Sequence, residues 1–340
     1  MSSLKIKNQL TEMLGIDFPM IMAPMFLVSN FEMISEAMKN GIAGTFPSLN
    51  FRKENELDEI LLELNKVKNS LGEIKGNYGV NIIVQKTNIL FEKHLDICTK
   101  HKVPFYITSL GNPAPVIKAA KTYGGKVFCD VTNLVHAKKC AEEGCDGFIA
   151  VGQGAGGHAG PNPLQVLVPA LIKIFPDIPV IAAGGIATGG GVLSCLALGV
   201  SGVSVGTRFI SSTEAKVSNE YKQAINKSGM DDIVMTTKIS GTPCTIINTD
   251  YAKKIGYEQN WLEKKLSNNS TTKKYFKMLV QFRGMKKLED SVLPANYKTL
   301  WCAGKSAELI DETKSCKEII DSIIRETKHD YEKLKKTFQE

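Results

Sequence analysis

Short apolar runs alternate with amphipathic segments along the chain up to about residue 210. The apolar runs occupy residues 20–25, 42–46, 79–84, 105–110, 126–131, 147–151, 179–183 and 202–206. They are continuous and rich in β-branched residues, which is typical of strands buried on both faces of a parallel sheet. Helical periodicity marks the segments between them, at 31–39, 54–68, 89–100, 114–123, 134–143, 163–175 and 190–198.

Eight predicted strands alternating with helices favour a (β/α)8 TIM barrel, an α/β fold. A doubly wound sheet is the alternative, but it usually has fewer strands, and its glycine fingerprint is absent after the first run. The alternation of apolar runs and helical segments ends after Arg208, and residues 214–296 are lysine-rich and helical in pattern. We therefore predict a barrel built from residues 1–213 and 297–340, ending in a helix over 316–338. Residues 214–296 form a predicted inserted, mainly helical cap on the substrate side.

The composition is that of a globular protein, with 43% hydrophobic and 23% charged residues, which argues against disorder, collagen and coiled coil. No apolar run is long enough for a transmembrane helix, and the N-terminal residues lack the apolar core of a signal peptide. The eight cysteines contain no CxxC pair. We expect buried thiols in a cytoplasmic protein, with no metal site and no membrane partner.

The formal charge of +7 first suggests a nucleic-acid partner, but only four of the 42 basic residues are arginine. Base readout and phosphate clamping favour the arginine fork, so we expect no nucleic-acid partner. Residues 253–290 hold ten basic and four acidic residues, so most of the net charge falls in the predicted cap. This basic segment fits anionic small molecules or carrier thioesters, and an ordinary solvated helix surface is the alternative.

The segment VGQGAGGHAGP at 151–161 follows the sixth predicted strand and contains one titratable side chain, His158. Glycine lets the backbone approach a ligand closely, and the loop after a barrel strand lies on the catalytic face. Histidine is suited to proton transfer near neutral pH. We therefore predict that His158 is catalytic, the alternative being a surface histidine in a long turn.

Two further glycine-rich segments follow the last two strands, AAGGIATGGG at 182–191 and SVGTRF at 204–209. Backbone N–H groups in glycine loops and at helix N-termini bind anions, and these two loops of a barrel often hold a phosphate. The pair predicts a phosphorylated cofactor or substrate. Tight turns without a ligand are the alternative.

These residues resemble the nitronate monooxygenase (2-nitropropane dioxygenase) family, which includes FabK-type enoyl-acyl-carrier-protein reductases. The motifs that carry the resemblance are FPMIMAPM (18–25), YGVNI (78–82), SLGNP (109–113), AGGHAG (155–160), IAAGGIATG (181–189) and VGTRF (205–209). The resemblance implies an FMN-dependent barrel with His158 as the catalytic histidine. The implied cofactor-binding residues are Met22, Ala23, Met25, Asn81, Asp130, Ala183, Gly184, Gly185, Gly206 and Thr207.

Three positions depart from the family pattern. Gly154 stands where many members have glutamate, Met22 where many have glutamine, and Lys305 where related chains have glutamine after Gly304. The resemblance implies oxidation of an alkyl nitronate by O2 to a carbonyl compound and nitrite. An NAD(P)H-dependent enoyl-thioester reductase and a non-catalytic flavin-binding protein are the alternatives. The oligomeric state is left open, with a homodimer among the options.

Overall fold

Eight parallel strands form a closed barrel in the computed structural model, which describes residues 4–85, 87–239, 242–258, 280 and 300–338. The strands close in the order β1-β2-β3-β4-β5-β6-β8-β9, and β1 pairs with β9. Their bounds are β1 Met20–Met22, β2 Ala43–Pro47, β3 Asn77–Ile83, β4 Phe105–Ser109, β5 Lys126–Val131, β6 Gly147–Val151, β8 Val180–Ala183 and β9 Gly202–Val205. The predicted TIM barrel is confirmed, and each predicted apolar run overlaps one of these strands.

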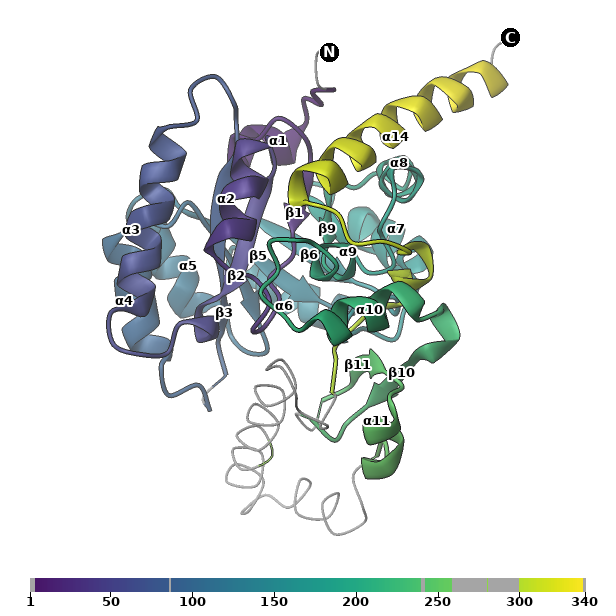
Figure 1. Ribbon diagram of the computed structural model, residues 1–340. Helices are drawn as coiled ribbons and strands as arrows, with labels where there is room; N and C mark the ends of the chain where they lie inside the picture. Colours follow the sequence, from purple (N-terminus) through teal and green to yellow (C-terminus); the bar gives the residue numbers. More distant parts are fainter. Residues whose placement is uncertain (1–3, 86, 240–241, 259–279, 281–299, 339–340) are drawn as a thin grey trace.

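The helices form the outer layer of the barrel (Figure 1). They are α2 Phe31–Lys39, α3 Glu56–Asn69, α4 Phe91–Lys100, α5 Ala114–Lys121, α6 Leu134–Glu142, α7 Leu164–Ile174, α8 Gly189–Ala197 and the short α9 Thr207–Ile210. Side chains cap several N-termini, as where Asn133 accepts a hydrogen bond from His136 N, which satisfies an orphan backbone donor. The C-terminal α14, Cys316–Thr337, begins with a capping box at Ser315 and lies beside α8 and α2 (Figure 1).

Two hydrophobic clusters divide the strand side chains between the barrel interior and the helix layer. On β4, Phe105 and Ile107 belong to the interior cluster, whereas Tyr106 packs with the outer cluster. This alternation follows the period of two along a strand. The interior cluster also contains Leu10 and Leu14 of α1, Gln9–Leu14, which closes the end of the barrel where the strands begin. The opposite end is therefore the one available for a ligand.

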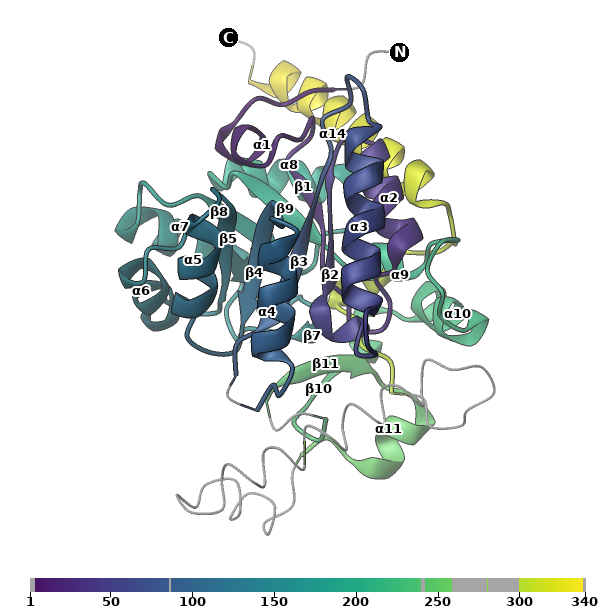
Figure 2. The same ribbon diagram turned by 90° about the vertical axis from the view of Figure 1, so that its left-hand side faces the viewer.

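The described part of the predicted cap contains a small antiparallel sheet in addition to helices. It includes α10 Asn219–Lys227, β10 Ile233–Thr236, β11 Cys244–Ile247 and α11 Asp250–Ile255. The sheet has the order β10-β11-β7, where β7 is Gly157–His158 from the barrel loop. Figure 2 shows this sheet at the end of the barrel opposite α1. The pattern predicted helices here and missed the sheet, because its strands span only two to four residues.

Candidate functional site

A cavity of about 630 Å³ lies at the carboxyl ends of the barrel strands. Nearly all residues singled out in the sequence line it: Ala23, Met25, Asn81, Asp130, His158, Ala183, Gly184, Gly185, Gly206 and Thr207. They come from loops or strand ends that are far apart in the chain. The barrel topology brings them together because parallel strands end at one edge.

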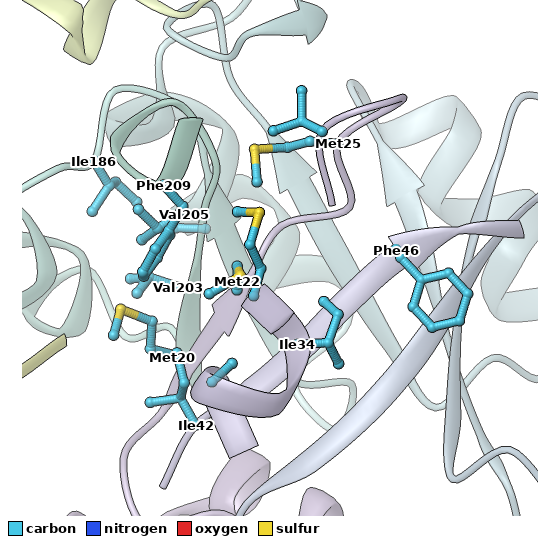
Figure 3. Packing of buried hydrophobic residues seen from close by; sticks show 14 of the residues in the cluster. Met20, Met22, Met25, Ile34, Ile42, Phe46, Ile186, Val203, Val205 and Phe209 are labelled. Atoms are coloured by element: carbon cyan, nitrogen blue, oxygen red, sulfur yellow. The ribbon is translucent and has the colours of Figure 1, made fainter. Parts of the chain in front are cut away.

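Met22 is the exception among the sequence-predicted site residues. Its side chain is fully buried and does not line the cavity. Figure 3 shows it on the helix side of β1, among Met25, Val205 and Phe209. The preceding residue, Ile21, belongs to the barrel interior instead. The Met22 carbonyl oxygen accepts a hydrogen bond of 2.6 Å from Thr45 Oγ1, which joins β1 to β2.

Three glycine-containing segments pack backbone against backbone beside the cavity. A Cβ atom on Gly156 would lie 2.8 Å from Gly304 N, and one on Gly184 would lie 2.7 Å from Ala155 N. Gly184 also has a φ of +117°, a conformation that side chains other than glycine rarely adopt. A Cβ on Gly154 would lie 3.0 Å from Gly185 N, so the absence of a larger residue at Gly154 follows from this packing. The glycines thus shape the wall of the cavity.

The loops after β8 and β9 carry backbone N–H groups beside this cavity. No described residue accepts a hydrogen bond from the N–H of Gly184, Gly185 or Gly206. The Thr207 hydroxyl accepts a hydrogen bond of 2.9 Å from Gly304 N, which ties the residue after β9 to the chain returning from the cap. Unpaired N–H groups that face a cavity form a binding site for phosphate or another anion.

His158 lies on β7 and is held in place by β11. In the register, His158 pairs with Cys244 and Gly157 pairs with Thr245. The Thr245 hydroxyl donates to Ala155 O at 2.6 Å. His158 is an exposed residue that lines the cavity, so a ligand in the cavity can reach its imidazole. Desolvation lowers the pKa of His158, which favours a neutral imidazole at pH 7.

Three polar residues form a hydrogen-bonded chain across adjacent strand ends. Asn81 Nδ2 donates to Ser109 Oγ at 2.7 Å, and Ser109 Oγ donates to Asp130 Oδ2 at 2.5 Å. Burial raises the pKa of the Asp130 carboxyl to about 6, and the Ser109 hydrogen bond opposes this rise. Ser109 lies within the SLGNP motif, but no feature of the motif distinguishes it from its neighbours.

The cavity also contains residues that the sequence reasoning did not identify. Arg52 lines it, with its guanidinium 5.9 Å from the centroid of the Phe26 ring. Three more come from the cap and the segment after it: Tyr221, Cys244 and Cys302. Lys305 does not line the cavity, and its backbone N donates to Gly154 O at 3.2 Å. No local signal marks the cap residues, because only the tertiary fold brings them to the barrel.

Most of the basic segment predicted at 253–290 lies outside the described residues, which include only 253–258 and residue 280 of it. Within the described residues, no group of three or more histidine, cysteine or acidic side chains is arranged to hold a metal ion. The helices in the described part of the chain include none that is long and apolar enough to span a membrane.

The barrel, the cavity at its carboxyl end and the glycine loops around it define the class of protein. It is a TIM-barrel protein with a cavity at the carboxyl ends of its strands, lined by the glycine loops after the last two of them. The sequence matches the nitronate monooxygenase family over residues 48–326, and the chain belongs to this family. It is accordingly an oxidoreductase by family.

Two kinds of curated relative cover most of the chain. The (3aS,4S,5R,7aS)-5-hydroxy-7a-methyl-1-oxo-octahydro-1H-indene-4-carboxyl-CoA dehydrogenase of Mycobacterium tuberculosis is 27% identical over 349 residues, covering 94% of this chain and 96% of the relative. A probable nitronate monooxygenase of Staphylococcus aureus is 28% identical over 311 residues, covering 78% of this chain and 85% of the relative. The relatives thus differ in the substrates that their names give.

Solved structures share the fold over nearly the full length. FabK from Thermotoga maritima has a TM-score of 0.81 at 29% identity, covering 98% of this chain and 100% of that chain. A nitroalkane oxidase from Streptomyces ansochromogenes has a TM-score of 0.76 at 18% identity, covering 96% of this chain and 99% of that chain. The second comparison supports the fold alone.

Proposed function

We propose that the protein is an FMN-dependent oxidoreductase that oxidises alkyl nitronates with O2 to a carbonyl compound and nitrite. The observation that carries the proposal is that His158 and the unpaired N–H groups of Gly184, Gly185 and Gly206 line one cavity. A phosphate group and a reacting group can therefore bind to the same enclosed space. Membership of the nitronate monooxygenase family supports the choice of reaction.

The residues around the cavity fit FMN. The N–H groups of Gly184, Gly185 and Gly206 would bind its phosphate, and Thr207 would support them through its bond to Gly304 N. Ala23, Met25, Asn81, Asp130 and Ala183 line the rest of the cavity and would contact the remainder of the cofactor. Bound FMN would supply the redox chemistry, and the protein supplies position and electrostatics.

His158 would act on the substrate as a neutral imidazole. Its lowered pKa keeps a nitrogen lone pair available near neutral pH, so it can accept a proton or orient the nitro group through a hydrogen bond. Hydrogen bonds from Thr245 to Ala155 and Gly157 hold this loop. Arg52 lines the cavity, and its guanidinium would attract the anionic nitronate. We retain the proposal that residues 214–296 act as a substrate-side cap.

The test is oxygen uptake by the purified, FMN-loaded protein with propionate 3-nitronate. We expect turnover in the wild type and a loss of about 100-fold or more in His158→Ala, because general acid–base groups contribute roughly this much. His136→Ala is the matched control, since His136 is exposed, its Nδ1 lies 3.3 Å from Thr132 Oγ1, and it does not line the cavity. No oxygen uptake by the wild type, or full activity in His158→Ala, would refute the assignment.

Reduction of an enoyl thioester by NAD(P)H is the second candidate. The observation in its favour is the apolar part of the lining, which suits an acyl chain: Phe26, Leu49, Ile83, Ile89, Leu90, Leu110, Ile239 and Leu300. The names of the CoA dehydrogenase and FabK relatives are consistent with it. Anaerobic flavin reduction, tested in parallel with nitronate, NADH and NADPH, separates the two. Reoxidation of the reduced flavin by crotonyl-CoA would support the enoyl-thioester reductase. A protein that binds flavin but whose flavin is reduced by none of the three compounds would be a flavin-binding protein without this catalysis.

A further inference from the structure

Two thiols lie together in the wall of the cavity, in a place that the proposed reaction does not use. The Sγ atoms of Cys244 and Cys302 are 3.9 Å apart, although 58 positions separate the residues in the chain. Both residues line the cavity, and Cys302 is partly exposed whereas Cys244 is buried. The two thiols are therefore close together, and Cys302 is the one that a small molecule entering the site can reach.

The small sheet explains why the two thiols meet. Cys244 pairs with His158, while Ile246, two residues further along β11, forms an antiparallel bridge with Cys302. Residues two apart on a strand share a face, so Cys244 and Cys302 project to the same side of the sheet. Ile247 N donates to Trp301 O at 2.8 Å, and Tyr221 Oη donates to Cys302 O at 2.5 Å. These bonds fix the backbone on both sides of the pair.

The two thiols are chemically unequal. The hydrogen bond from Cys244 lowers the pKa of the Cys302 thiol, whereas the pKa of Cys244 is raised by the same interaction and by burial. The thiolate is the nucleophilic form of cysteine, so Cys302 is the group that reacts first. Cys244 is positioned to act second.

We propose that Cys302 and Cys244 form a redox-active modification site that small hydroperoxides convert to a reversible intrachain disulfide. The Cys302 thiolate attacks the terminal peroxide oxygen and the O–O bond breaks, which gives a sulfenic acid; the other oxygen takes up a proton and leaves as water from hydrogen peroxide or as an alcohol from an organic hydroperoxide. Cys244 then attacks Cys302 Sγ, the S–O bond breaks, and water leaves. Each peroxide thus takes up two electrons and two protons from the dithiol.

Closing the bond brings the sulfurs from 3.9 Å to about 2.0 Å. It joins β11, which holds the His158 strand, to the segment that contacts Gly156 and Thr207 through Gly304. A dithiol reductant reverses the step by thiol–disulfide exchange. The inference does not depend on the proposed substrate, because the oxidant in the test is added hydrogen peroxide.

The test uses the full-length reduced protein, a small molar excess of hydrogen peroxide, and alkylation of the remaining thiols under denaturing conditions. Peptide mass mapping is expected to show a link between Cys244 and Cys302, the loss of two hydrogen atoms, and full recovery of both thiols after dithiothreitol. Alkylation of all eight cysteines after peroxide treatment would overturn the proposal. A link confined to the other thiol neighbours, Cys129 with Cys140 or Cys145, would overturn it equally.

Two variants assign the roles. In Cys244→Ser, a dimedone adduct is expected on Cys302, because the sulfenic acid has lost its partner. In Cys302→Ser, Cys244 should gain no adduct at the same peroxide dose, and equal labelling of the two thiols would contradict the assigned order. Cys140→Ser is the matched control, because this buried thiol lies outside the cavity lining and should leave the link at the wild-type level. The wild-type peptide map decides the question even where a variant fails to fold.

Discussion

The Asp130 carboxyl offers a quantitative test of the electrostatics around the cavity. A pKa of about 6, in place of the ordinary 3.8, means that the folded protein favours the protonated carboxyl by about 3 kcal/mol. Because the folded-state pKa is raised, the wild type carries no penalty from this group below about pH 4. The penalty grows as the pH rises through about 6 and is complete above about pH 7.

Asp130→Asn removes this penalty with almost no change in shape. The amide oxygen can still accept the hydrogen bond that Ser109 Oγ donates to the carboxylate. We therefore expect the variant to be more stable than the wild type by up to about 3 kcal/mol near pH 8 and by almost nothing near pH 4. The stabilised variant should bind or use its cofactor less well if the carboxyl serves the site.

Denaturant unfolding of the flavin-free proteins at several pH values measures the effect, since bound ligand would add its own stabilisation. Equal denaturant slopes in the two proteins are required for the comparison. Asp177→Asn, at an exposed position, is the control for the chemical change itself. A stability difference between Asp130→Asn and wild type that stays flat from about pH 4 to about pH 8 would refute the reasoning.

Three other predictions concern close backbone contacts and the His158 loop. In Gly156→Ala, the Cβ would lie 2.8 Å from Gly304 N, so the variant should lose roughly 1–3 kcal/mol of stability in chemical unfolding. Titration of the apoprotein should also show weaker FMN binding, and an unchanged affinity would contradict the role of this backbone contact in the site. In Gly189→Ala, the Cβ would lie 2.2 Å from Thr327 N, so thermal unfolding should reveal a loss of similar size, whereas Gly190→Ala, which meets only Asp330 Oδ2 at 3.0 Å, should be neutral or stabilising. Thr245→Val removes the hydrogen bond to Ala155 O, so stability should fall by about 1 kcal/mol and steady-state turnover should fall more than FMN affinity.

The barrel was predictable because each of its strands carries a local signal. β4 is a run of buried residues, and it ends where Leu110 adopts a φ of +60°, outside the strand region. The small sheet carries no such signal. β7 is only Gly157–His158, and it becomes a strand because Cys244 and Thr245, nearly ninety residues away, supply its partners. Pairing of that kind depends on the fold rather than on the pattern of the segment.

The residues of the candidate site also differ in whether a local sequence signal predicts them. The glycine loops could be identified because their composition reflects a local backbone requirement, as at Gly184 with its φ of +117°. Met22 was associated with the site through resemblance, although the period of two along β1 separates its side chain from that of Ile21. Tyr221 lies within the cap and Cys302 in the segment that returns from it, so only the tertiary fold brings the two residues to the cavity.

The contacts around Gly304 join the loops after β6 and β9 to the segment that returns from the cap. A Cβ on Gly304 would lie 2.5 Å from Gly154 O and 2.7 Å from Gly156 N, so the returning segment seats directly on the His158 loop. The same segment donates a hydrogen bond from Gly304 N to Thr207, next to the proposed phosphate site. Displacement of this segment must therefore disturb the phosphate site and the His158 loop together. Gly156→Ala probes this contact from the barrel side and Thr245→Val probes the loop from the cap side, so loss of function in both would locate the coupling at the loop between them.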